Sequence, residues 1–160
     1  MEKKHIWRAM IYFFILTGAF QVQANEVSKL SEGQTLYVPA YSHIYIGNKA
    51  NPYMLTVTLS IRNIDPDHTI TITAVDYYGT KGKLVKQYLD TPISLSALES
   101  TRYIIASKED AGGSGANFIV KWSSEKRTNP PIIESIMIGT QSQQGISFTS
   151  RGQVIYPTTP

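Results

Sequence analysis

The residues best suited to bind a ligand form a short segment in which a histidine stands between two tyrosines. Tyr41, His43 and Tyr45 alternate with small or aliphatic residues. Successive side chains of a β-strand point to opposite faces, so these three would share one face while Ile44 and Ile46 point inward. Two phenols and an imidazole on a solvent face can stack on a sugar ring or contact a peptide. The alternative is cross-strand packing, because tyrosine is favoured in strands in any case.

A second polar cluster resembles the start of a calcium loop. Asn63, Asp65 and Asp67 have the spacing of its first oxygen ligands. The pattern then fails, because His68 stands where the loop needs glycine and an alanine stands where it needs a bidentate glutamate. A different calcium geometry that uses Asp76 stays open. Turn chemistry of Asx and proline residues, closing a hairpin, explains the cluster better, so we predict no metal site.

Two other segments offer groups that can meet an anion. Residues 112–117 read Gly-Gly-Ser-Gly-Ala-Asn, but a phosphate loop leads into a helix and ends in Lys-Ser or Lys-Thr, so a flexible turn is predicted instead. Arg151 beside Gly152 is the second candidate for ligand binding. It can pair with Glu134 or meet an anionic ligand, and a plain surface arginine at a strand end is the alternative.

No known catalytic signature is present in the sequence. There is neither a Gly-x-Ser-x-Gly elbow nor a His-Glu-x-x-His motif. Beyond residue 24 the chain has two histidines, His43 and His68, and neither has a partner at zinc-ligand spacing. We therefore predict no catalytic residue and no cofactor. An enzyme that uses His43 or His68 as general base at an unrecognised, hydrolase-type site remains the rival hypothesis.

Most of the chain has the pattern of short β-strands. In residues 55–62 apolar residues alternate with Thr, Ser or Arg, and residues 70–74 repeat this period of two. The turn-rich link between them predicts that the two strands are antiparallel neighbours. Further strands are predicted from Gln34 onward, at 82–89, 101–106, 117–123, 132–138, 145–148 and 154–156. Turn signals every 8–12 residues indicate an antiparallel β-sandwich of about eight strands, immunoglobulin-like in the broad sense.

The N-terminal end has the three-part layout of a secretory signal peptide. Lys3, Lys4 and Arg8 precede an apolar run, and small residues end it at Ala24, where cleavage is expected. The run is shorter than the roughly 20 apolar residues that span a bilayer. The predicted parts are the signal peptide (1–24), a flexible lead-in (25–33), one β-sandwich domain (34–156) and a C-terminal tail (157–160). The expected location is the periplasm or the medium.

Charge and cysteine content narrow the class further. The chain of 160 residues carries +3, of which the signal segment holds +2, so 160 − 24 = 136 residues carry about +1. Such a balance gives no reason to expect nucleic acid as a partner, or stable membrane insertion after cleavage. No cysteine is present, which excludes thiol chemistry and a lipid anchor on cysteine.

Several segments together resemble a known family. They are residues 36–45, 58–63, 70–78, 113–118 and 131–134, with 139–140 and 145–148. These segments resemble a bacterial family with no assigned activity, domain of unknown function 3124, over roughly residues 34–154. The resemblance implies an exported β-protein and supplies no catalytic residues. The predicted function is a non-catalytic binding or interaction module of the cell envelope. Its partner would be an envelope protein, a glycan or a small molecule.

Overall fold

The computed structural model describes residues 30–47, 50–141 and 143–157, which form β-strands and turns. The predicted signal peptide lies outside the described residues. The strands are β1 (Ser31–Pro39), β2 (His43–Tyr45), β3 (Pro52–Met54), β4 (Thr56–Arg62), β5 (Ile70–Tyr78), β6 (Leu84–Gln87), β7 (Ile93–Leu95), β8 (Ser100–Ile105), β9 (Asn117–Thr128), β10 (Ile132–Gln141), β11 (Gln144–Arg151) and β12 (Gln153–Pro157). The described strands number twelve rather than about eight, mainly because β3 and β7 are too short to give a clear periodic signal.

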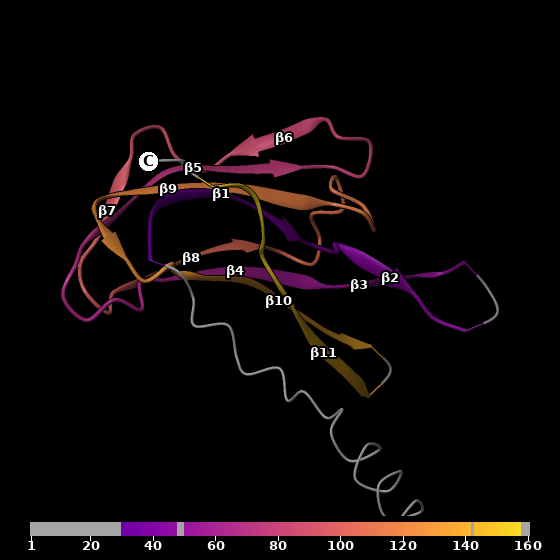
Figure 1. Cartoon of the computed structure of the whole chain (residues 1–160). Helices are drawn as coiled ribbons and strands as arrows, with labels where there is room; N and C mark the ends of the chain where they lie inside the picture. The colour runs from indigo at the N-terminus through magenta and orange to yellow at the C-terminus, as the bar shows by residue number, and fades with distance from the viewer. Residues whose placement is uncertain (1–29, 48–49, 142, 158–160) are drawn as a thin grey trace, which may run out of the picture.

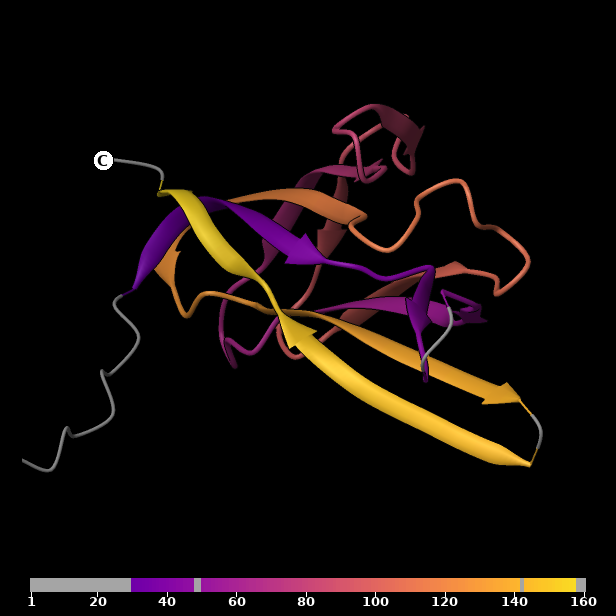
Figure 2. The same cartoon turned by 90° about the vertical axis from the view of Figure 1, so that its right-hand side faces the viewer.

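The strands form two antiparallel sheets that lie face to face (Figure 1). One sheet has the order β12-β1-β9-β5-β6, with β7 also paired to β5, and the other has the order β11-β10-β4-β8. The strands β2 and β3 form a separate hairpin at one end of the sandwich. Figure 2 shows the β10–β11 hairpin extending beyond the sheets at the same end. The predicted antiparallel β-sandwich is confirmed.

The core between the two sheets is built from the apolar positions of the alternating strands. Val57, Leu59 and Ile61 of β4 are fully buried, and so are Phe118 and Val120 of β9. Full burial of a side chain of this size contributes roughly 1.5–3 kcal/mol to stability. The buried face predicted from the period of two in residues 55–62 is therefore confirmed, and the alternating residues of β9 supply further core positions.

The prediction that residues 55–62 and 70–74 are antiparallel neighbours is wrong. β4 pairs with β10 and β8, whereas β5 pairs with β9, β6 and β7 in the opposite sheet. The link between the two strands crosses the edge of the sandwich instead of closing a hairpin. Alternation shows which face of a strand is buried, and two strands that face one core from opposite sheets have the same pattern.

Both ends of the described domain extend further than predicted. β1 begins at Ser31, inside the segment expected to be a flexible lead-in, because β9 is long enough to pair Ser31 with Thr128. β12 includes Pro157, the first residue of the predicted tail. Between β11 and β12 the chain changes sheets at Gly152, whose N–H donates to the carbonyl of Ile133 at 2.8 Å.

Candidate functional site

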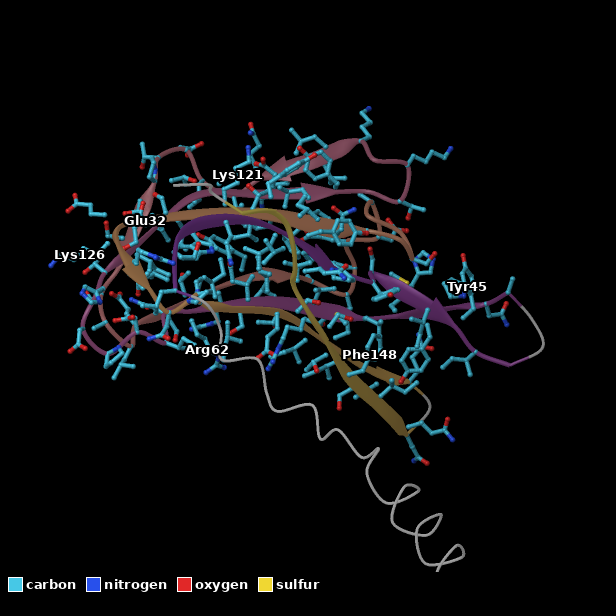
Figure 3. All side chains as sticks on the ribbon, in the orientation of Figure 1. Glu32, Tyr45, Arg62, Lys121, Lys126 and Phe148 are labelled. Carbon is cyan, nitrogen blue, oxygen red and sulfur yellow. The ribbon has the colours of Figure 1, made fainter. Side chains whose placement is uncertain are left out.

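The structure brings His43 and Tyr45 together on the β2–β3 hairpin. The Nε2 atom of His43 lies 3.2 Å from the Tyr45 hydroxyl, and the two rings cross at 84° with their centroids 5.3 Å apart. The side chain of Tyr45 is 57% exposed, and Figure 3 shows it on the hairpin at the end of the sandwich. The pair thus presents an aromatic edge and an imidazole on a projecting element.

Tyr41 is placed apart from this pair. It precedes β2, is half-buried against the core, and its ring meets that of Phe148 at a centroid distance of 5.8 Å. Ile44 packs against the core as expected, but Ile46 is largely exposed because β2 ends at Tyr45. The three predicted residues therefore do not form one continuous strip, since only two of them belong to the same strand.

The base of the hairpin is fixed from two directions. The Tyr53 hydroxyl of β3 donates to the carbonyl of Gln144 at 2.9 Å, which joins this hairpin to the β10–β11 hairpin. On the other side Ser42 is fully buried, and its hydroxyl lies 3.2 Å from that of Tyr77, whose pKa is raised by burial. The backbone N–H of Ser42 donates to Gly113. Exposed Tyr45 and half-buried His43 therefore stand on a support that is fixed by hydrogen bonds.

The glycine-rich segment 112–117 serves as part of that support. Its carbonyls accept hydrogen bonds from Ser42 and from the backbone and side chain of Thr80. The N–H of Gly113 donates to Asp110, and the N–H of Gly115 donates to the Thr80 hydroxyl at 3.0 Å. These N–H groups are used within the protein, so the predicted turn is fastened to its neighbours and does not form an anion cradle.

The turn after β4 is organised around the buried carboxylate of Asp65. One oxygen accepts the N–H groups of Asp67 and His68 and lies 3.0 Å from Nδ1 of His68. The other accepts the backbone and side-chain N–H groups of Asn129 at 2.9 and 3.0 Å. The side-chain amide of Asn63 completes the turn. It donates to the carbonyls of His68, of Leu95 at the end of β7, and of Ser96, the next residue. These contacts are the Asx turn chemistry that the sequence predicted, although they close no hairpin.

The same contacts determine the charge state of Asp65. The Thr128 hydroxyl and the Asn129 N–H hold the pKa of this carboxyl well below its usual range, and they outweigh the effect of burial. The Asn129 contact has good geometry, whereas the buried Thr128 hydroxyl makes no hydrogen bond of normal geometry. We therefore attribute the shift mainly to the backbone and amide donors. The carboxylate is ionised throughout the neutral and mildly acidic range.

His68 lies beside a polar cleft of about 360 Å³. The cleft is lined by Asp67, His68, Thr69, Thr71, Ser94, Ser124, Glu125 and Lys126. A carboxylate accepts but does not donate, so Asp65 places the hydrogen of a neutral imidazole on Nδ1 and leaves Nε2 as an acceptor. The Ser124 hydroxyl, which also lines the cleft, does not donate to this Nε2 atom. It donates to the carbonyl of Thr69. The Asp-x-x-His spacing of residues 65–68 is the sequence signal that could have revealed this pair.

The described residues do not bring Asp65, Asp67 and Asp76 together as a calcium site. Asp76 lies near the far end of β5 beside Gln87, six residues beyond Ile70 and thus about 20 Å along the strand. Both oxygens of Asp65 are already occupied by N–H donors. Within residues 30–47, 50–141 and 143–157, no three His, Cys, Asp or Glu side chains are grouped to hold a metal ion.

Arg151 lies at the end of β11, and its backbone is directly opposite that of Glu134 on β10. The two side chains form no ion pair within 4.0 Å, in the part of the chain that the structure describes. Arg62 and Arg102, which the sequence did not single out, lie on the same outer face of this sheet. Their grouping depends on the strand order, which no local pattern in the sequence reveals.

The fold and these sites define an all-β sandwich protein with an exposed aromatic hairpin at one end. In the residues that the structure describes, no helix is long and apolar enough to cross a membrane. The chain belongs to the family described as "Protein of unknown function (DUF3124)", whose model matches residues 33–155. No curated protein matches the chain.

One similar solved structure is described as "Crystal Structure of Thermotoga maritima 1070". It is 15% identical, with a TM-score of 0.45, over 75% of this chain and 92% of that chain. A similarity at this level carries no inference about function.

Proposed function

We propose that this protein is an exported, non-catalytic binding module of a bacterial cell envelope and that it contacts its partner through the β2–β3 hairpin. The observation that carries the proposal is exposed Tyr45 beside half-buried His43, on a hairpin whose base is held by buried contacts. Tyrosine on a rigid support gives contact area with little loss of side-chain entropy on binding. The signal-like N-terminal sequence supports export.

The test of this proposal compares Tyr45→Ala with Tyr156→Ala, which removes an even more exposed tyrosine on β12. The protein is recovered from the periplasm or medium, and its mass is checked against that of a chain starting at Asn25. Its Tm is then measured with and without each of a panel of envelope glycans and metabolites. A ligand at a hundred times its Kd adds about 2.7 kcal/mol, which raises Tm by roughly 10 °C. We expect Tyr45→Ala to remove this shift and Tyr156→Ala to keep it.

A protein partner is tested in the same positions by photo-crosslinking in living cells. A photoreactive phenylalanine at position 45 should capture a discrete envelope protein that the same group at position 156 does not capture. Equal capture at both positions, or equal loss of the thermal shift in both alanine variants, would place the binding site elsewhere. A protein that keeps its N-terminal 24 residues and stays in the cytoplasm would contradict the export part of the proposal.

The second candidate function is a hydrolase that uses His68 as general base. The observation in its favour is the Asp65–His68 pair beside a polar cleft. General-base catalysis contributes about 10²–10⁴-fold in rate, so His68→Asn should lose at least a hundredfold of any hydrolysis of chromogenic esters and glycosides. His43→Asn, at the other end of the domain, is the matched control and should leave the rate unchanged. Equal rates in the two variants would argue against this function.

A further inference from the structure

Three arginines from different strands share the outer face of the β11-β10-β4-β8 sheet. On one row across the strands, Ser60 of β4 lies opposite Arg102 of β8 and opposite Glu134 of β10, which in turn lies opposite Arg151 of β11. Arg62 is two residues from Ser60 on the same face. Neighbouring strands are about 4.8 Å apart, so the Cα atoms of Arg102 and Arg151 are about 14 Å apart. The three arginines therefore come from neighbouring positions of one face.

These guanidinium groups have donors available for a partner. Arg62 Nε donates to the Ser60 hydroxyl at 3.1 Å, and Ser60 is only 6% exposed although it points outward. The Arg62 side chain and its neighbours thus cover Ser60, at the centre of the row. Within the described ranges the one ion pair joins His68 and Asp65, so none of these arginines is neutralised by a carboxylate at close range.

The arginines of the chain are distributed unevenly between the two sheets. Beyond residue 24 the sequence has four arginines, and three of them lie on this face, while the fourth, Arg127, donates to the carbonyl of Leu30. The strands β4, β8, β10 and β11 contain no lysine. Figure 3 shows Arg62 and Lys121 on opposite sides of the sandwich. Arginine is the side chain whose planar fork best fits phosphate oxygens.

The same face carries exposed isoleucines next to the arginines. Ile104 is 54% exposed and follows Arg102 by two positions on β8, while Ile138 is 51% exposed on β10. Ile138 lies opposite Thr56 and Ser147, four positions along the face from Glu134. A soluble polyanion would use the arginines but leave these isoleucines in water. The interface of a bilayer accommodates both, with phosphates for the guanidinium groups and the upper acyl region for aliphatic side chains.

We propose that the outer face of the β11-β10-β4-β8 sheet docks onto an anionic lipid surface, with Arg62, Arg102 and Arg151 at the phosphates and Ile104 and Ile138 at the acyl boundary. The contact is peripheral, so it needs no membrane-spanning segment. It uses a surface different from the β2–β3 hairpin. Failure of this proposal would therefore leave the proposed binding function intact, and the reverse also holds.

The first test is co-sedimentation of the processed protein with vesicles of phosphatidylcholine and phosphatidylglycerol in equal amounts, compared with phosphatidylcholine alone. The variant Arg62→Gln/Arg102→Gln/Arg151→Gln should weaken binding about fivefold per arginine, and thus about a hundredfold in total. The control Lys81→Gln/Lys83→Gln/Lys121→Gln removes the same charge at exposed positions of other elements. It should stay within about twofold of the original chain.

The second test separates a lipid surface from a soluble polyanion. Ile104→Ser/Ile138→Ser should weaken vesicle binding while keeping its salt dependence, and Leu84→Ser/Val85→Ser, on the exposed β6, should not. Thermal melting confirms that each variant is folded. No binding to anionic vesicles, equal losses in the arginine and lysine variants, or binding to dextran sulfate but not to vesicles would each overturn the proposal.

Discussion

Asp65→Asn is expected to lower Tm at neutral pH by roughly 10 °C. Both carboxylate oxygens face donors, namely the N–H groups of Asp67, His68 and Asn129. An amide in either orientation turns its NH₂ group toward N–H groups and loses at least two of these bonds. Buried donors are then left unsatisfied, at a cost greater than that of the bonds alone.

The effect of Asp65→Asn should also depend on pH. The pKa of Asp65 is lowered on folding, so its stabilising contribution is fully present above the unfolded pKa of about 4 and is lost as the pH falls further. The gap in Tm between the original chain and the variant is therefore constant from about pH 7 to pH 5 and narrows below about pH 4. Thermal melting followed by circular dichroism across this range measures it.

Asp67→Asn is the matched control, because this exposed aspartate lies in the same turn and its side chain accepts none of the bonds that hold the turn. It should change Tm by no more than about 2 °C, as surface substitutions do. If the two variants melt together, or if the gap does not narrow in acid, the carboxylate of Asp65 is not the centre of this turn.

The turn at Asp65 shows which contacts local sequence patterns can predict and which they cannot. The spacing of Asn63, Asp65 and Asp67 predicts an Asx turn, and the structure contains one. The sequence could not show that Asn129, 64 residues away, supplies two of the donors to Asp65. The partners of β4 and β5 were missed for the same reason, because a period of two identifies the buried face and not the neighbouring strand.

For the candidate binding surfaces, too, the sequence predicted contacts within one strand and missed those that depend on the order of the strands. Alternation correctly places His43 and Tyr45 on one face, since both lie within β2. It fails for Tyr41, because the strand begins after that residue and the backbone changes direction at buried Ser42. The arginine face was missed because Arg62, Arg102 and Arg151 are 40 or more residues apart in sequence. Only the order β11-β10-β4-β8 brings them together.

Gly139→Ala is expected to destabilise the protein by about 3 kcal/mol and to lower Tm by roughly 10 °C. A Cβ at this position would lie 2.6 Å from Cε1 of Tyr53, 2.7 Å from the carbonyl oxygen of Met54 and 2.8 Å from Cδ2 of Leu55. One of these atoms belongs to the backbone, so a rotamer change of Tyr53 cannot relieve the contact. The backbone at the end of β3 must move away from β10 instead, or β10 from it.

Gly145→Ala is the control for this substitution. Gly145 lies in the same β10–β11 hairpin, opposite Thr140, and a Cβ there would meet no atom within 4 Å. Alanine in a strand is also favoured over glycine by roughly 0.5–1 kcal/mol, so Tm should be unchanged or slightly higher. Equal stability of the two variants would show that β3 adapts freely at its contact with β10.

The same pair of variants tests whether the position of the hairpin matters for binding. Displacing β3 breaks the bond from the Tyr53 hydroxyl to Gln144 and moves the strand that pairs with His43 and Tyr45. Measured well below its Tm, Gly139→Ala should therefore bind the partner of Tyr45 more weakly than Gly145→Ala does. Unchanged affinity in a destabilised Gly139→Ala protein would mean that the pair acts without its rigid support, and the support would then serve stability alone.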